Sequence, residues 1–573
     1  MALQGTGFTA DLAVSFDGVP ATIVSATATE LTVVVPETYG YPVIAVDEVS
    51  AERLLFVGSA YAGASTIDGI QEALDALPEN AALRLAAGTF GAPGTSLDLD
   101  NRKLYGAGSA TVLDLPDTLD LYARSTHVTV LQDLAVSGEP DVYVNRGRLS
   151  TASVAPIVPS GTVVFQDVDL TLGAFEIDDD YLHVIIHDAT VDATYLYADG
   201  YGSRIDIAGS SFTLSDYWDV DTYGALSMRG TTIVAGGDVD VDIDYVDGIT
   251  FDDVTVEAGG RIYVYLYDAV GSTGLSLSDT QLTAGSSIYI GSSSNPIFVE
   301  GSSLTAATYV EIDADDYGAV IDLIDTTVTA GTYALIGDGY AGVNVQGSDV
   351  TAGTYVYLYA YGNLSVVEST LTAQTDYIYG SSDYSDALLI RDSDLDAATY
   401  VEFSVYGPVL VEGGTVTAGT AFDITSWYAG DITLRGVEAI TADTMYIHDG
   451  GSSYAGNNGV VTLADNGPIT ITDVMSLNLF YSDLVVSGNG PISAGLIDWQ
   501  ARHAHVTIAD NERVESATDV GIYAAMAGGR LSATNTLFVA DGGSGTITLE
   551  TLAGELTLSG NTFTGTLVTP NNP

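Results

Sequence analysis

The chain contains no cysteine among its 573 residues. Disulfide frameworks and thiolate metal sites are therefore excluded, and thiols give no indication of the redox compartment. Apolar runs are short, and none approaches the roughly 18 residues of a transmembrane helix. The first residues, Met-Ala-Leu-Gln-Gly-Thr-Gly, lack the basic and apolar regions of a secretory signal. If Met1 is the native start, we expect no export by the standard secretory route and no membrane partner.

Basic residues are scarce: 15 lysine and arginine residues stand against 76 acidic ones, which gives a formal net charge of -61. Lys103 is the single lysine. A surface this acidic repels phosphate backbones, which excludes nucleic acid as a partner. In molar salt the Debye length falls to about 3 Å, so the self-repulsion of such a surface is screened while its carboxylates stay hydrated. The composition therefore indicates a protein adapted to a halophilic environment.

What the chain has in abundance is a repeat. A motif of the form Thr-Ala-Gly-Thr-Tyr-Val recurs, and 227 residues, or ten steps of 22.7, separate its first aromatic residue, Tyr195, from its last, Phe422. This period suits one coil of a parallel β-helix and is too short for a helical repeat. The pattern predicts a first aromatic column at Tyr195, Tyr217, Tyr263, Tyr289, Tyr309, Tyr333, Tyr355, Tyr377, Tyr400 and Phe422. It predicts a second column at Tyr201, Tyr223, Tyr317, Tyr340, Tyr361, Tyr384, Tyr406 and Tyr428.

These aromatic columns have two interpretations. Exposed aromatic rings stack on sugars in glycan-binding proteins, and they supply contact area with a polar tip at adhesive surfaces. A tyrosine that recurs at nearly every coil is also explained by stacking within the fold, whereas a binding site appears once. We therefore interpret the columns as structural.

Residues 1–48 differ from the repeat, because short alternating runs separated by turn residues predict a small all-β segment. The segments Gly5-Thr-Gly-Phe8, Val14-x-Phe16-x-Gly18-Val-Pro-Ala21 and Leu31-Thr-Val-x-Val-Pro36 follow one another in this segment. This order resembles the IPT/TIG family of immunoglobulin-like domains. The resemblance implies a β-sandwich used for docking or spacing, with no chemistry of its own.

Residues 49–80 contain a linker and one amphipathic helix. Ile67, Ile70, Leu74 and Leu77 fall on one face, and Thr66 is placed to cap the helix N-terminus. The segments "LRLAAGTF" and "LYGAG" follow at residues 83–90 and 104–108. This order resembles the first coil of the pectate-lyase-like superfamily of right-handed parallel β-helices, in which the helix covers the open end.

The expected fold is thus all-β, an immunoglobulin-like sandwich followed by a helix-capped parallel β-helix (solenoid) with coils of about 22 residues. We expect the regular solenoid over residues 81–430. Over residues 431–573 the motif weakens, which predicts irregular coils and a C-terminal end that a cap or a partner chain covers.

The superfamily resemblance implies that polysaccharide lyase or hydrolase chemistry must be considered. Lyases of this fold use a basic residue beside Ca²⁺, and hydrolases use paired carboxylates. The candidate bases are spread along the repeat without a cluster: Arg204, Arg229, Arg261, Arg391 and Arg435. Carboxylates are so abundant that a pair at catalytic distance carries no information. We assign no catalytic residue and expect no enzymatic activity.

A metal site is the remaining candidate. Asp238, Asp240, Asp242 and Asp244 alternate with aliphatic residues, so on a strand their carboxylates share the outer face and form a candidate Ca²⁺ site. Further acidic candidates lie at Asp178, Asp179, Asp180, Asp313, Asp315 and Asp316. No known calcium-loop pattern matches, so a solvated acidic face explains these residues as well. Two histidine pairs, His183 with His187 and His503 with His505 near Asp498 and Asp510, supply too few ligands for a metal site and are interpreted as surface residues.

Three functional classes remain open. The first is a virion surface protein (tail spike, tail fibre or capsid-vertex spike) of a virus that infects a halophilic host, located extracellularly on the particle and acting in attachment. The second is a secreted adhesin or surface-layer component, and the third is a polysaccharide-degrading enzyme. In the first class we expect a homo-oligomer, with a trimer favoured over a pentamer. Residues 1–48 would bind other virion proteins, and the solenoid would bind a host-surface glycan or surface-layer protein.

Overall fold

The computed structural model describes most of the chain. The described residues are 2–4, 12, 14–16, 19–27, 30–34, 44–46, 49–51, 59–61, 66–91, 96–123, 127–145, 161–178, 180–244, 248–267, 274–316, 318–337, 339–383, 387–428, 430–449, 459–480, 482–502, 504–524, 529–552 and 554–570. The chain divides into two compact units, Met1–Gly259 and Gly260–Pro573. In the described part of the chain, no helix has the length and apolar character needed to cross a membrane.

The first unit begins with two small antiparallel sheets. One has the strand order β1 (Ala2–Gln4), β5 (Glu30–Val34), β4 (Thr22–Ala26). The other has the order β3 (Val19–Pro20), β2 (Val14–Phe16), β6 (Ile44–Val46), β7 (Val49–Ala51). The described residues of this segment that lie in regular elements are therefore all in strands, as the sequence predicts. Its assembly as an immunoglobulin-like sandwich stays a prediction.

The predicted helix is α1 (Ile67–Asp75). The Thr66 side chain accepts a hydrogen bond from the Gly69 N–H, and Ile67, Ile70 and Leu74 are buried, as the sequence indicates. The helix also covers the first strand of the stack, β11 (Leu97–Asp100). Gln71 donates to the Asp98 carbonyl at 3.3 Å and accepts from the Asp98 N–H at 2.8 Å. Its side chain therefore replaces the missing neighbour strand at an open sheet edge.

The remainder of the first unit and the strands of the second each form a parallel β-solenoid with three strands per coil. Equivalent strands of successive coils pair in parallel, and each such set is called a row. In the first unit, the first row runs from β11 to β27 (Val239–Asp244), the second from β8 (Ser59–Tyr61) to β28 (Gly248–Asp252), and the third from β10 (Gly88–Gly91) to β29 (Thr255–Ala258). The long strands β15 (His127–Ser137) and β17 (Gly161–Thr171) belong to both the second and the third row.

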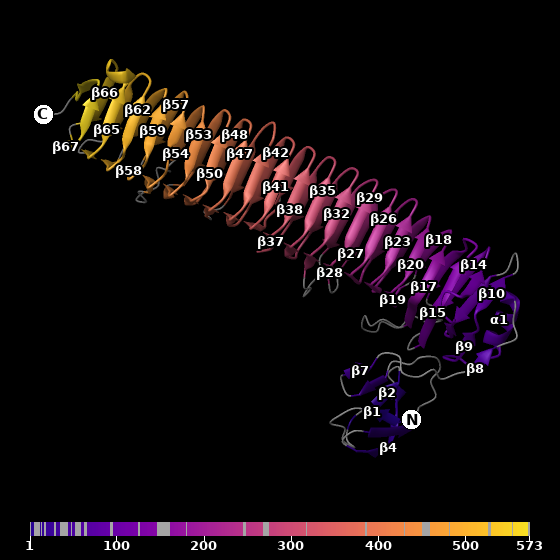
Figure 1. The fold of residues 1–573 in the computed structure, drawn as a ribbon. Coiled ribbons are helices and arrows are strands. Elements are labelled where there is room, and N and C mark those ends of the chain that lie inside the picture. The colour runs from indigo at the N-terminus through magenta and orange to yellow at the C-terminus, as the bar shows by residue number, and fades with distance from the viewer. Residues whose placement is uncertain are drawn as a thin grey trace. The chain divides into compact units, whose positions relative to one another are not determined.

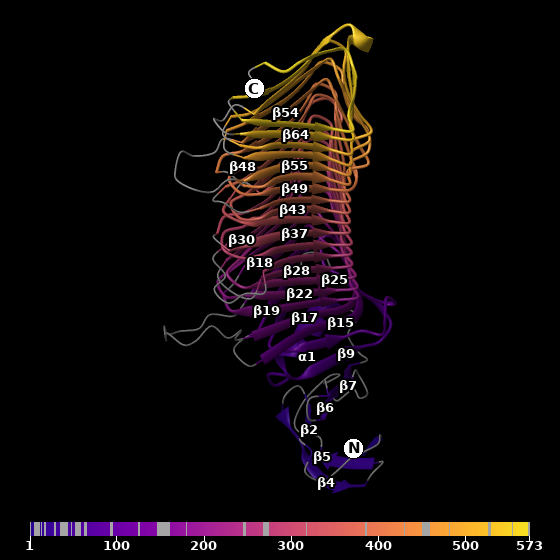
Figure 2. The ribbon, with the colours of Figure 1, turned by 90° about the vertical axis from the view of Figure 1, so that its left-hand side faces the viewer.

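In the second unit each of the three rows contains every third strand in chain order, so each strand pairs with its equivalent in the next coil (Figures 1 and 2). The first row runs from β30 (Ile262–Tyr267) to β69 (Thr566–Val568), the second from β31 (Leu275–Ser278) to β67 (Glu555–Ser559), and the third from β32 (Gln281–Ala284) to β68 (Thr562–Thr564). The parallel pairing continues past residue 431 to the last strands. The parallel β-solenoid predicted from the period is confirmed.

The recurring Thr-x-Thr-Ala motif is the third strand of a coil. In β38 (Thr327–Ala330) both threonines are exposed while the residues between and after them are buried. Residues in register form ladders, and the inward ladder is Val328, Val350, Leu371 and Leu395. Each such burial stabilises the fold by about 1.5–3 kcal/mol. The glycine that follows the motif fits where coils approach closely, because a Cβ on Gly353 would lie 2.1 Å from the Gly331 carbonyl oxygen.

A second internal ladder is polar and lies at the corner between the second and third strands. In the second unit it begins with hydroxyl side chains: Ser348 Oγ accepts the Thr326 N–H at 3.0 Å and donates to the Gln346 carbonyl at 2.9 Å. Farther along the chain asparagine takes this position at Asn466, Asn489 and Asn511, and Thr536 returns a hydroxyl to it in the next coil. These side chains satisfy backbone groups that the turn buries.

The first tyrosine column is confirmed in its central part. The rings of Tyr309 and Tyr333 are 4.9 Å apart and 3° from parallel, and the stack continues through Tyr355 to Tyr377 at 5.1 Å per step. These ring faces cover one another, so the column is a structural ladder.

The register corrects two other parts of this column. Tyr263 pairs with Tyr289, but Tyr289 lies opposite Glu311, two residues after Tyr309. Tyr263 and Tyr289 therefore share the outer face with Tyr309 but belong to a separate ladder, displaced by two residues along the strand. Phe422 is fully buried, and Ala421 takes the place opposite Tyr400. Because strand side chains alternate with a period of two, aromatic spacing alone does not separate these ladders. Tyr317 and Tyr384 of the second column lie outside the described residues.

Candidate functional site

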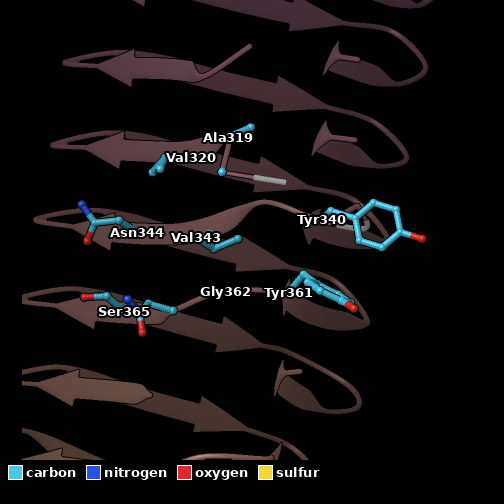
Figure 3. A pocket seen from close by; sticks show the side chains of 11 residues that line it. Ala319, Val320, Tyr340, Val343, Asn344, Tyr361, Gly362 and Ser365 are labelled. Carbon is cyan, nitrogen blue, oxygen red and sulfur yellow. The ribbon is translucent and has the colours of Figure 1, made fainter. Parts of the chain in front are cut away.

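A groove on the second unit is the strongest candidate site. It has a volume of about 590 Å³ and draws its walls from three successive coils (Figure 3). Its strands are β37 (Val320–Ile324), β40 (Gly342–Gln346) and β43 (Leu364–Val367). The lining residues are Gly318, Ala319, Val320, Tyr340, Gly342, Val343, Asn344, Tyr361, Gly362, Asn363 and Ser365.

The hollow exists because one outward position has no side chain. Val320 of β37 lies opposite Gly342 of β40, and the outward position two residues on carries Asn344. A Cβ placed on Gly342 would meet only the Asn363 backbone, at 3.5 Å, which is ordinary van der Waals contact. A larger residue is therefore sterically tolerated there, and glycine leaves the groove open.

Two tyrosines of the second column stand at one end of the groove, and Asn344 and Ser365 stand at the other (Figure 3). The rings of Tyr340 and Tyr361 have centroids 4.9 Å apart and planes 70° apart, unlike the parallel rings of the first column. Tyr340 is 47% exposed. The perpendicular arrangement gives the groove an aromatic wall instead of a closed stack.

The polar groups of the groove are uncharged. The Asn344 amide nitrogen donates to Asp322 Oδ1 at 3.1 Å, so its amide oxygen remains as an acceptor. The Asn363 side-chain oxygen accepts the Ala387 N–H at 3.1 Å, so its amide nitrogen remains as a donor. None of the eleven lining residues is an aspartate, glutamate, lysine or arginine, although the chain has 76 acidic residues.

The predicted calcium candidates lie on the first unit. In β27 the aliphatic residues point inward and Asp240, Asp242 and Asp244 outward, as the alternation predicts. Asp238 and Asp240 also line a hollow of about 370 Å³ with Asp216 and Asp219 of the preceding coil. Among the described residues, no group of three or more histidine, aspartate or glutamate side chains gathers closely enough to hold a metal ion. Calcium binding at this row stays a prediction.

The electrostatics of this row follow from the register. Asp221 of β24 (Trp218–Thr222) lies directly opposite Asp242, and Asp219 lies opposite Asp240. Burial, together with the neighbouring carboxylates Asp221 and Asp240, raises the pKa of Asp242 to about 7. Proton uptake by Asp242 thus partly relieves the repulsion between carboxylates on neighbouring strands.

The other predicted acidic residues are dispersed. Asp313 is buried on β36 (Val310–Ala314), and Asp315 accepts a hydrogen bond from the Tyr265 hydroxyl at 3.3 Å. On the first unit, Asp178 ends β18 (Ala174–Asp178), and Asp180 accepts the Tyr201 N–H at 2.9 Å. Asp179 lies outside the described residues. Within the described part of each unit, these acidic residues therefore do not gather into a metal site.

The histidines take part in local pairs. His183 and His187 share the outer face of β19 (Leu182–His187), and His183 Nε2 lies 2.6 Å from Asp206 Oδ2, which also accepts from Arg204 Nε at 2.9 Å. Although burial opposes the change, these hydrogen bonds hold the pKa of Asp206 below its usual value. His505 Nδ1 accepts the Arg530 N–H, and His503 lies outside the described residues.

The residues beside that second histidine pair bond elsewhere. Asp498 accepts hydrogen bonds from Gln500, and Asp510 accepts one from Asn535.

The candidate bases lie on separate coils, and four of the five have a side-chain contact. Arg204 and Arg435 form ion pairs with Asp206 and Glu412 at 2.9 Å, and Arg229 pairs with Asp252 at 3.3 Å. Arg261 lies over the ring of Tyr263, 5.4 Å from its centroid. Arg391 ends β46 (Leu388–Arg391) with an exposed side chain. The ion pairs of Arg204, Arg229 and Arg435 each use a different carboxylate.

Sequence reasoning missed the groove, because it treated all tyrosines of the second column alike. The available signal was local: Tyr340-Ala-Gly342 places a glycine at an outward strand position that carries valine one coil earlier.

Comparisons with known proteins add little. No protein-family model matches the chain, and no curated protein matches it. Among solved structures, the chain has a slight likeness to the catalytic unit of a thermostable GH87 alpha-1,3-glucanase from Streptomyces thermodiastaticus strain HF3-3. The two share 12% identity over 85% of each chain, with a TM-score of 0.13. The assignment of a role therefore depends on the residues of this chain alone.

Proposed function

We propose that this chain is a structural attachment protein on the surface of a virion, either a tail spike or fibre or a capsid-vertex spike, of a virus that infects a halophilic host. The observation that carries the attachment role is the uncharged groove on the second unit. Its volume of about 590 Å³ exceeds the 370 Å³ of the acidic hollow and the 310 Å³ of a hollow near Tyr523. A concave site with an aromatic wall and a few polar groups is the usual form of a ligand site.

The solenoid is well suited to be the scaffold of such a site. Its strands are paired in continuous rows, apolar and polar ladders run inside the coils, and stacked tyrosines join the coils from Tyr309 to Tyr377. A rigid stack of this kind holds the groove in place without a separate domain. The acidic composition supports work in molar salt, where the charge is screened.

The finer parts of the proposal rest on the sequence. Residues 1–48 form an IPT/TIG-like, immunoglobulin-like module that anchors the chain to other virion proteins. The chain assembles as a homo-oligomer, with a trimer favoured over a pentamer. If a chain that lacks residues 1–48 is still incorporated normally into particles, this anchoring role is wrong.

The attachment role is tested by a binding experiment. Purified full-length chain is incubated in molar salt with isolated cell envelopes of the halophilic host, and the envelope-bound fraction is measured after sedimentation. Saturable binding is expected, and its absence would contradict the attachment role. A release of reducing ends or unsaturated uronates would indicate a glycan-cleaving enzyme instead. Absence of the chain from purified particles would favour a secreted adhesin.

A further inference from the structure

We propose that the groove between Tyr340 and Ser365 binds an extended, uncharged glycan. This inference rests on the attachment role proposed above and adds the chemical class of the ligand. It is carried by four observations: the charge of the lining, the chemistry at its two ends, its size, and the pairing of the strands beneath it.

The charge of the lining selects a neutral ligand. The groove has no acidic or basic lining residue, whereas the hollow on the first unit is lined by four aspartates. A basic peptide would gain more from the aspartate-lined hollow than from this groove. An acidic polysaccharide would find no lysine or arginine in the lining, so each carboxylate that it placed in the groove would lose its water without gaining an ion pair.

The two ends of the groove match the two kinds of surface that a sugar presents. Tyr340 and Tyr361 offer aromatic surface to the apolar C–H face of a sugar ring. At the other end, the Asn344 amide oxygen accepts hydrogen bonds, and the Ser365 hydroxyl both donates and accepts them. The amide nitrogen of Asn363 adds a donor to the lining. Sugar hydroxyls donate and accept, so they satisfy this mixed set.

The size indicates an oligosaccharide. The groove of about 590 Å³ lies within the roughly 300–1,000 Å³ of ligand sites. Its aromatic end and its polar end are contributed by different parts of each coil, so one ligand must extend along the groove to reach both (Figure 3).

The strands beneath the groove disfavour an extended peptide. A peptide that adds to a sheet needs an unpaired strand edge. Here β40 pairs with β37 on one side and with β43 on the other, so its backbone groups are occupied. A ligand in the groove must be recognised by side chains, which suits a glycan.

The experiment uses calorimetry to measure the binding of three neutral hexasaccharides, of glucose, mannose and galactose, to the full-length chain in molar salt. Hexagalacturonate serves as the acidic comparison. We expect at least one neutral hexamer to bind and the uronate not to bind. Tyr340→Ala is expected to lower the affinity at least tenfold. Gly342→Val fills the groove at a position where a Cβ fits, and it is expected to lower the affinity by a similar factor.

The matched control is Tyr446→Ala, because Tyr446 is 43% exposed on β54 (Thr444–Asp449), outside the groove. Its affinity should stay within twofold of the unsubstituted chain, and circular dichroism confirms that all variants fold. The inference is overturned if no neutral hexamer binds, if the uronate binds as tightly, or if Gly342→Val binds normally. If envelopes are still bound in any of these cases, the attachment role stands, and only the assignment of a neutral glycan to this groove is wrong.

Discussion

Asn489 offers the sharpest test of the internal polar ladder. Its buried side chain makes four hydrogen bonds: it accepts from the Asn466 N–H and amide nitrogen, and it donates to the Leu463 carbonyl and the Asn511 amide oxygen. Asn489→Ala removes all four and leaves the Asn466 N–H and the Leu463 carbonyl buried without these partners. Each of these two orphaned groups costs about 1–3 kcal/mol, so we expect a loss of about 2–6 kcal/mol in local stability.

Hydrogen exchange read by mass spectrometry measures this loss, because coils of a solenoid contact mainly their neighbours and open locally. Peptides over residues 460–515 should lose protection by that amount. Asn489→Ser should be milder, since serine fills the same corner at Ser348 and accepts the neighbouring N–H. Thr507→Ala, on the exposed outer face of β61 (Val506–Ala509), should change stability by less than about 0.5 kcal/mol. Equal protection in Asn489→Ala and Thr507→Ala would refute the reasoning.

Two further predictions concern the first unit. The pKa of Asp242, raised to about 7, lies above the unfolded value of about 3.9, so its stabilising effect is complete below pH 4 and is lost as pH rises through 7. Thermal unfolding should therefore occur at higher temperature at pH 5 than at pH 8. Asp242→Asn should reduce the difference in unfolding temperature between pH 5 and pH 8, and Asp169→Asn, at an exposed position, should not. Equal reductions in the two variants would contradict the raised pKa of Asp242. Gln71→Ala should lower protection of residues 97–100 by about 1–3 kcal/mol in hydrogen exchange, because the β11 edge loses both contacts, whereas the exposed Glu72→Ala should not. Unchanged exchange at Asp98 would mean that Gln71 does not cap this edge.

The sequence predicted the solenoid because its signals are periodic. The third strand of each coil repeats the same inward and outward alternation, and the Thr66 cap and the apolar face of α1 follow local rules. The exact ladder of each tyrosine was not predictable, since Tyr289 and Tyr309 both face outward and differ by two positions in register. Phe422 shows the opposite error, because a shift of one position moves a side chain from the outer face to the core.

The groove was not predictable for a different reason. It depends on residues of three coils and on a missing side chain at Gly342, and register must be known before these positions are recognised as neighbours. The asparagine ladder had a visible signal, the Ser-Gly-Asn triplets ending at Asn489 and Asn561. Their inward direction follows only from the left-handed turn at the glycine before each, with φ of 67° at Gly488.

The most direct test of the attachment role is a footprint of the full-length chain bound to host envelopes. Hydrogen exchange with and without envelopes, in molar salt, reports which peptides become protected. The proposed role predicts protection over residues 318–365, around Tyr340, and no change around the acidic hollow at residues 216–240. Protection confined to the acidic hollow, or none in either segment despite binding, would contradict the groove as the attachment site.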